Sequence, residues 1–240
     1  MKGTSPKPRL ALIAACVWPL VAPSQIFTHE FEVDAAIPDD NSTGFADIRN
    51  VQQTGGVIGS LSLRLGLSAE PGFSAFLGDL YAYVEHDGKI AVLLNRPGRT
   101  AAAPFGYEDN QPLDIQFSDG GPDAHGYRPT EDTPLSAPLS GTFSPDGRAA
   151  DPVSVLDSDE RSLLLDQFNG LSPDGEWTLF VADLSGGGHH HLVQWSIELE
   201  LAEIPEMPVW LTGGGLLAWR WWVRRQRDCP KRVSTVRMGP

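Results

Sequence analysis

The stretch "DLYAYVEHDGKIAVLLN", residues 79–95, decides the fold class. Its first half alternates apolar Leu80, Ala82 and Val84 with larger or polar side chains, the two-residue period of a half-buried strand. Asp87-Gly88 then interrupts the pattern, and Asp-Gly between two alternating runs is typical of a tight hairpin turn. The stretch therefore predicts two antiparallel strands.

The same period recurs on both sides of this hairpin. Residues 61–67 place Leu61, Leu63, Leu65 and Leu67 on one face, and further strands are expected over residues 113–117 and 177–184. A last strand over residues 193–201 is expected to direct Val193, Trp195, Ile197, Leu199 and Leu201 inward. Such rows supply a core, because each fully buried large apolar side chain contributes about 1.5–3 kcal/mol.

Turn sequences separate the predicted strands, and one segment has a helical pattern. Ser-Pro-Asp-Gly occurs at residues 144–147 and again at 172–175. Residues 157–168, "DSDERSLLLDQF", predict a short helix capped by Asp157 or Ser158. The expected fold is all-β, an antiparallel β-sandwich with one short helix, in one domain over residues 25–202.

Charge is distributed unevenly along the 240 residues. Residues 25–202 contain 8 Lys or Arg and 28 Asp or Glu, a formal net charge of −20, whereas both ends of the chain are basic. Such a domain repels nucleic acid and anionic lipid, and it can attract divalent cations or basic partners. The two cysteines, Cys16 and Cys229, lie outside this domain, so no disulfide framework is expected in it.

Residues 1–24 have the pattern of an export signal. Lys2, Lys7 and Arg9 precede an apolar run over residues 10–22 that is too short to span a bilayer, and small residues favour cleavage before Gln25. A lipid anchor on Cys16 is an alternative, since "IAAC" has the form of a lipidation site.

The C-terminal segment, residues 203–240, combines an apolar stretch with a basic tail. Residues 208–223 are apolar but contain Gly213–Gly215 and Arg220, and as a helix they would be shorter than the hydrocarbon core of a bilayer, about 30 Å. The basic tail, residues 224–240, would stay on the cytoplasmic side during export. The segment is expected to contact the membrane before processing, and an ordinary permanent anchor is the alternative.

Three stretches carry a resemblance to a known family: "IPDDNSTGF" at 37–45, "GDLYAYVEHDGKIAVLLNRPG" at 78–98, and "GEWTLFVADLSGGG" with "LVQWSIELEL" between 175 and 201. They resemble the P domain, or P/Homo B domain, of proprotein convertases and bacterial exoproteins. This resemblance implies a jelly-roll sandwich that accompanies a subtilisin-like protease and has no catalytic residue of its own.

The C-terminal segment has a resemblance of its own. "IPEMP" at residues 204–208, the apolar stretch and the arginine cluster together resemble the PEP-CTERM sorting signal, although Met207 stands inside the motif. This resemblance implies a bacterial protein that an exosortase recognises, at the cell envelope or in an extracellular polysaccharide matrix.

Catalytic motifs are missing from the sequence. There is no His-Gly-Thr and no Gly-x-Ser-x-Gly, and the chain is too short for a subtilisin-type domain, so we expect no enzymatic activity. His189, His190 and His191 are adjacent, and because neighbouring residues of an extended chain face opposite sides, we interpret them as a solvated turn and not as a zinc site.

Calcium is the expected metal, since carboxylates from separate loops of a sandwich can converge on one ion. The candidate ligands are Asp39, Asp40, Asp79, Asp119, Asp123 and Asp183. Capping of turns by these side chains is the alternative. Tyr81, Tyr83, Tyr107 and Tyr127 offer a carbohydrate or protein contact face, with cross-strand packing as the alternative for the first two.

These features favour a non-catalytic, exported binding or structural module at the cell envelope or in the extracellular matrix. Two alternatives remain: an accessory module that acts in trans with a secreted protease, and a calcium-stabilised carbohydrate-binding module that contacts extracellular polysaccharide.

Overall fold

The structure is a computed structural model that describes residues 25–108, 110–126 and 138–202. All of these belong to the first of two compact units, Met1–Glu203. The predicted export signal, the sorting segment, both cysteines and Tyr127 lie outside the described residues. Within the described ranges, no helix combines the length and the apolar character needed to cross a bilayer.

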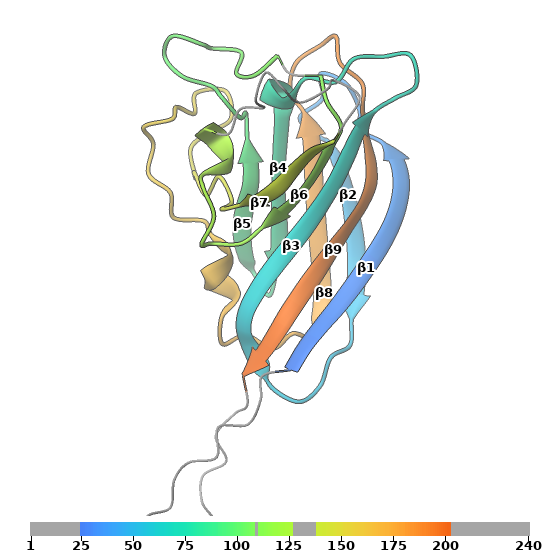
Figure 1. Cartoon of the computed structure of the whole chain (residues 1–240), viewed down its shortest axis with the longest axis vertical. Helices are drawn as coiled ribbons and strands as arrows, with labels where there is room; N and C mark the ends of the chain where they lie inside the picture. The colour runs from blue at the N-terminus through green and yellow to red at the C-terminus, as the bar shows by residue number, and fades with distance from the viewer. Residues whose placement is uncertain (1–24, 109, 127–137, 203–240) are drawn as a thin grey trace, which may run out of the picture. The chain divides into compact units, whose positions relative to one another are not determined.

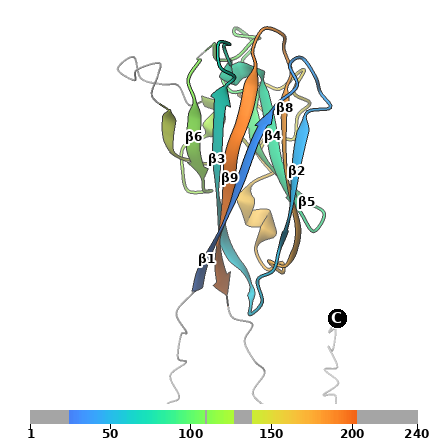
Figure 2. The same ribbon diagram turned by 90° about the vertical axis from the view of Figure 1, so that its right-hand side faces the viewer.

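The described chain forms two β-sheets that pack face to face (Figure 1; Figure 2). Sheet A has the order β1 (Gln25–Ala36), β9 (His190–Ala202), β3 (Val57–Ala69), β6 (Leu113–Phe117) and β7 (Leu139–Phe143). Sheet B has the order β2 (Phe45–Val51), β8 (Gly175–Asp183), β4 (Leu80–His86) and β5 (Lys89–Asn95). The predicted all-β sandwich is confirmed, although β6 and β7 pair in parallel where only antiparallel pairs were expected.

The hairpin over residues 79–95 is present. His86 pairs with Lys89, and Asp87 and Gly88 between them have φ angles of 48° and 71°. Positive φ at both central positions is the backbone of a type I′ turn, which matches the twist of the strands on either side.

The core lies between the sheets and contains the predicted inward rows. Leu63, Leu65, Leu80 and Leu179 are completely or almost completely buried. Two tryptophans anchor it, and each finds a hydrogen-bond acceptor: Trp177 donates to the Pro173 carbonyl oxygen at 3.1 Å and Trp195 donates to Oδ2 of Asp47 at 2.6 Å. The second bond joins β9 of sheet A to β2 of sheet B, so it ties the two layers together.

One inward residue was predicted wrongly. Val193 is 37% exposed, and its neighbour Leu192 is buried instead. Along β9, Gln194 pairs with Gly66 and Leu192 pairs with Leu67, so β9 has one residue more than β3 at this point. This β-bulge reverses the alternation at its N-terminal side.

The helix predicted over residues 157–168 is also wrong. Only a short 3-10 turn, η3 (Leu165–Phe168), forms there. The backbone amides of Ser162 and Leu163 donate to the carbonyl oxygen of Gly147 at 2.8 and 2.9 Å, so they are not available for bonds within a helix. Asp119 accepts from the amides of Leu165 and Asp166, and contacts distant in sequence therefore outweigh local helix propensity. The other 3-10 turns of the described chain are η1 (Leu77–Asp79) and η2 (Ala124–Gly126).

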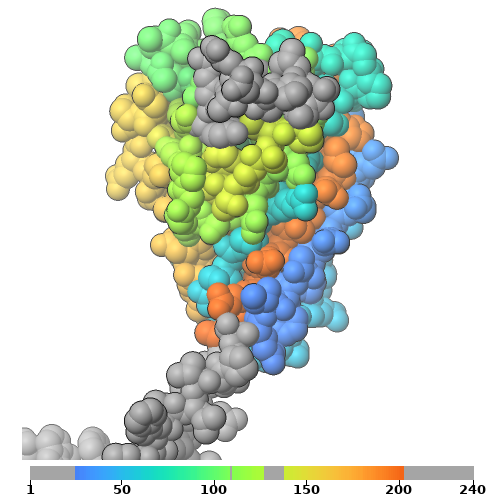
Figure 3. Space-filling model, in the orientation of Figure 1, coloured from blue at the N-terminus to red at the C-terminus, as the bar shows by residue number. Residues whose placement is uncertain are grey.

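The outer face of sheet A carries polar pairs, with Ile26 and Val193 as exposed apolar residues among them. β3, β9 and β1 cross it as adjacent diagonal bands (Figure 3). Arg64 and Asp114 form a two-pronged ion pair there at 2.7 Å for each bond, and Ser60 donates to Glu200 at 2.8 Å. The polar pairs give this face the character of a solvated surface.

The two ends of the sandwich differ. Gln25 at the start of β1 pairs with Leu201 near the end of β9, so the described chain begins and finishes at the same end (Figure 1). The loops at residues 37–44, 70–79, 96–108 and 184–189 lie at the opposite end. We call this set of loops the loop end.

Candidate functional site

The loop end is held together by backbone hydrogen bonds between its loops. The amide of Asn41 donates to Asp183 O at 2.8 Å, that of Leu184 to Asp79 O at 2.9 Å, and that of His189 to Ser74 O at 2.7 Å. These bonds connect segments that are far apart in the sequence, so the loop end is a preformed surface.

A pocket of about 420 Å³ opens at the loop end. Its lining residues are Phe76, Asp79, Phe105, Tyr107, Glu108, Ser185 and Gly186. The volume is in the usual range for sites that bind small molecules or single side chains.

Glycine permits the close packing of the pocket wall. The Gly78 amide donates to Tyr107 O at 2.8 Å, and a Cβ atom at position 78 would lie 2.3 Å from Phe105 O. The ring of Tyr107 lies over Gly98, where a Cβ atom would meet it at 2.5 Å. Two segments of the wall therefore touch backbone to backbone, in a way that no larger residue allows.

A buried charge cluster underlies the pocket. Arg96 donates through Nε to Gly78 O at 2.9 Å and through Nη2 to Ser185 Oγ at 2.9 Å, while its contact with Asp79 is longer, 3.5 Å. Burial raises the pKa of Asp79 above its ordinary value and the charge of Asp183 raises it further, while the hydrogen bond with Ser185 and the charges of Arg96 and His190 offset this only in part. The partners of Asp79 therefore offset only part of the cost of burying its charged carboxylate.

Asp183 is itself paired with a buried histidine. Its Oδ2 atom lies 2.7 Å from Nδ1 of His190, and the two residues are 0% and 2% exposed. Nε2 of His190 is buried without a hydrogen-bond partner among the described residues. The pair has the orientation of an acid-base dyad, but the nitrogen that would act as the base is closed to solvent.

The interpretation of residues 189–191 as a solvated turn is therefore wrong for His190. His191 and His189 lie nearer the surface, where His191 contacts Asp34 at 2.8 Å and His189 lies against the Phe73 ring with centroids 4.0 Å apart. Position 190 faces inward because it is two residues from buried Leu192 on the same strand. The sequence pattern pointed the other way: the alternation through Val193 and Trp195 placed position 190 on the outer face, and the β-bulge between Leu192 and Gln194 turns it inward.

The six aspartates predicted as calcium ligands separate into two groups. Asp39, Asp40, Asp79 and Asp183 lie at the loop end. Asp119 caps the η3 turn, and Asp123 forms an ion pair with Arg148 at 2.9 Å, so these two already have structural partners away from the loop end. At the loop end, Asp39 accepts a long bond from the Gly187 amide at 3.4 Å, and Oδ1 of Asp39 is buried without a partner among the described residues.

No group of three or more His, Cys, Asp or Glu residues in the described ranges is arranged to hold a metal ion. Calcium binding stays a prediction that thermal unfolding can test. A site would raise the melting temperature at millimolar calcium relative to EDTA, because a ligand that binds only the folded state stabilises it. The same melting temperature in both buffers would reject calcium, and magnesium is the control for ionic strength.

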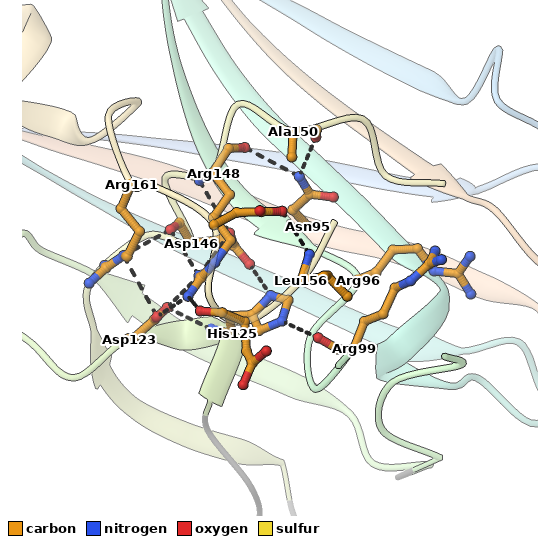
Figure 4. A network of polar contacts seen from close by, with 12 residues as sticks. Asn95, Arg96, Arg99, Asp123, His125, Asp146, Arg148, Ala150, Leu156 and Arg161 are labelled. Carbon is orange, nitrogen blue, oxygen red and sulfur yellow. Dashed lines mark hydrogen bonds and ion pairs between the residues drawn. The ribbon is translucent and has the colours of Figure 1, made fainter. Parts of the chain in front are cut away.

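A second buried polar network lies beside the sandwich, between residues 123–126 and 144–161 (Figure 4). Nδ1 of His125 lies 2.7 Å from Oδ2 of Asp146, and Nε2 of His125 lies 2.8 Å from Arg99 O. Both ring nitrogens face acceptors, and only the doubly protonated imidazole donates to both. His125 therefore fixes loops to one another and has no nitrogen left for catalysis.

This geometry predicts that stability depends on pH. Burial alone would lower the pKa of His125, but the hydrogen bond and the charge of Asp146 outweigh it, and the pKa lies above its ordinary value. A raised pKa in the folded state means that the stabilisation is complete below about pH 6.5, the ordinary value for histidine, and is lost as the pH rises through the folded-state pKa.

Urea unfolding of the wild type from pH 6 to pH 9 is expected to give a free energy of unfolding that falls with pH. His125→Gln should be less stable at pH 6 and should lack this decline. Parallel profiles for the two proteins would contradict the assignment.

The tyrosines fall in different places. Tyr81 and Tyr83 are half-buried on the outer face of sheet B, where Tyr83 stacks on Phe180 with centroids 4.9 Å apart. Cross-strand packing, the alternative considered for them, is thus observed. Tyr107 lines the pocket, which is where an aromatic contact with a ligand is available.

No protein-family model matches the chain, and no curated protein sequence is significantly similar to it.

Proposed function

We propose that this protein is a non-catalytic, exported binding module at the cell envelope or in the extracellular matrix, and that its binding surface is the loop end. The observation that carries the proposal is the difference between the two ends of the sandwich. The described chain begins and finishes at one end, and the preformed pocket lies at the other. A domain attached through its terminal segments would present this pocket away from the attachment.

Export is proposed from residues 1–24 and sorting from residues 203–240, with an exosortase as the transient partner. The P-domain resemblance is part of the same proposal, and the two-sheet sandwich is compatible with it.

A binding role fits the state of the buried histidines. In His125, both ring nitrogens are hydrogen-bonded inside the domain, and in His86 the two nitrogens lie 2.8 Å from Glu176 O and 2.7 Å from Ser172 O. A general base needs a nitrogen within reach of a substrate proton. These rings, together with the enclosed His190, support a module that binds without turnover.

The proposal is tested by fractionation and activity together. The full chain, expressed in a bacterium that has an exosortase, is expected outside the cytoplasm with Gln25 as its first residue, and deletion of residues 203–240 should release it into the medium. The purified protein should hydrolyse neither peptide nor glycoside substrates. Retention of the intact precursor in the cytosol, or turnover that persists through purification, would reject the proposal.

The P-domain resemblance favours one second candidate, an accessory module that acts in trans with a separately encoded secreted protease. In that case a protease should co-purify with the tagged chain and should unfold at a higher temperature in its presence. Phe105→Ala at the pocket rim should weaken this effect, whereas Ile48→Ala on the outer face of sheet B should not.

A further inference from the structure

The loop-end pocket has a lining of unusual chemistry. Three of its residues are aromatic, two are acidic, and none of the described lining residues is Lys or Arg. Aromatic faces attract organic cations, since the ring quadrupole presents negative charge. The combination of rings and carboxylates is the one that proteins use to bind ammonium and guanidinium groups.

The aromatic part of the pocket is available to a ligand. Phe105 is 70% exposed at the rim, an uncommon position for a large apolar ring. Tyr107 is held in place by its contact with Gly98 and by the bond from its amide to Pro97 O at 2.9 Å. The Tyr107 wall of the pocket is therefore rigid. The Phe105 ring faces solvent, and it gains contact area only when a partner binds.

The charge of the pocket is negative on balance. Arg96 lies behind the wall, where its Nε and Nη2 atoms are engaged by Gly78 O and Ser185 Oγ. Asp79 and Glu108 are in the lining and Asp183 lies close behind, whereas the described lining residues include no cationic side chain. A cation in the pocket would offset the remaining cost of burying the Asp79 carboxylate, whereas an anion would be repelled.

The charge of the domain acts in the same direction. Residues 25–202 have a formal net charge of −20, which attracts basic partners over a distance of about one Debye length, roughly 8–10 Å at physiological salt. Long-range attraction and local chemistry thus select the same class of ligand.

We propose that the loop-end pocket binds the basic side chain, Arg or Lys, of a polypeptide partner. This inference rests on the proposed function, because it names the ligand class of the same surface. The side chain enters between Phe105 and Tyr107, its aliphatic stem contacts the rings, and its cationic group pairs with Asp79 and Glu108.

The test is an NMR titration of the full chain with two peptides, acetyl-Gly-Gly-Arg-Gly-Gly-amide and the same peptide with citrulline. Citrulline keeps the shape of arginine but has no charge. The arginine peptide is expected to shift the amide signals of Gly78, Phe105 and Ser185, with an affinity about tenfold higher than that of the citrulline peptide, the size of one charge-assisted hydrogen bond. A lysine peptide should also bind.

Three variants separate a specific site from general attraction to an acidic domain. Asp79→Asn removes one lining charge without changing shape, and it should weaken the arginine peptide about tenfold while leaving the citrulline peptide unchanged. Phe105→Ala tests the rim independently, because its exposed ring contributes little to folding. Asp87→Asn removes the same charge from the β4–β5 turn, where Asn tolerates the positive φ, and it should have no effect.

The outcomes distinguish this inference from the proposed function. Equal binding of the two peptides, an unchanged affinity in both Asp79→Asn and Phe105→Ala, or shifts produced only by the neutral sugar cellohexaose would overturn the cation site and leave a binding module. If none of the peptides or the sugar shifts the pocket amides, the loop end is not a binding surface and both proposals fail.

Discussion

Replacing Arg148 with methionine is expected to lower the free energy of unfolding by about 3–5 kcal/mol, the cost of removing one partner from a buried ion pair. Arg148 is 4% exposed and contacts two carboxylates, Asp123 at 2.9 Å and Asp146 at 3.2 Å. It also donates to Asp157 O at 2.7 Å, so it joins the segment around residue 157 to the rest of the network.

The size of this effect follows from what the variant leaves behind. Asp146 is completely buried, and without Arg148 it would keep only His125 as a charged partner. A buried carboxylate that loses a cationic partner keeps the full cost of its desolvation. Methionine fills much of the space of the arginine stem. The decrease in unfolding free energy therefore measures the lost charge and hydrogen bonds more than the cost of a cavity.

Urea unfolding of wild type and Arg148→Met measures the difference, and Arg64→Met is the matched control. Arg64 makes a bidentate pair with Asp114 at 2.7 Å, better geometry than that of Arg148, but on the exposed face of sheet A. Exposed pairs contribute about 1 kcal/mol or less. Equal losses for the two variants would show that the network does not stabilise the domain as its burial implies.

Period-two patterning predicted the centre of the sandwich well, because strands that are buried on one face carry the pattern in their own residues. Leu61, Leu63, Leu65 and Leu67 are all buried, and the Asp87-Gly88 turn closes the expected hairpin. β1, β2 and β7 were not predicted. β7 has five residues, with exposed Ser140 and Gly141 in its middle, so it lacks the alternating pattern of a strand. It pairs in parallel with β6, and contacts distant in sequence therefore set its register.

The candidate site was predicted only in part. The sequence singled out Asp79 and Asp183 but did not indicate that Arg96 and His190 lie beside them, since the four residues come from four different segments. The pairing of His125 with Asp146 was likewise missed, because 21 residues separate them and the Ser-Pro-Asp-Gly motif around Asp146 indicates a turn but not a distant partner. Side chains in loops have no period, so their convergence depends on tertiary structure.

Replacing Trp177 with alanine is the second large loss that we expect, about 3–5 kcal/mol of unfolding free energy. Trp177 is completely buried in β8, and its ring stacks on His86 with centroids 4.0 Å apart and planes at 3°. Phe168 packs on it as well, with centroids 5.4 Å apart. Alanine would remove contacts with strand β4 and with the η3 turn at once, and it would leave His86 without its stacking partner.

Trp177→Phe and Ile48→Ala complete the series in thermal and urea unfolding. Phenylalanine keeps an aromatic ring but loses the bond from Nε1 to Pro173 O, so a smaller loss of about 1–2 kcal/mol is expected. Ile48 is 57% exposed on the neighbouring strand, and its truncation should change stability by about 0.5 kcal/mol or less. If the stack between β4 and β8 stabilises sheet B, the loss of unfolding free energy must be largest for Trp177→Ala, smaller for Trp177→Phe and smallest for Ile48→Ala. A loss below about 1 kcal/mol for Trp177→Ala would mean that the two sheets hold together without it, since even an average point mutation costs that much.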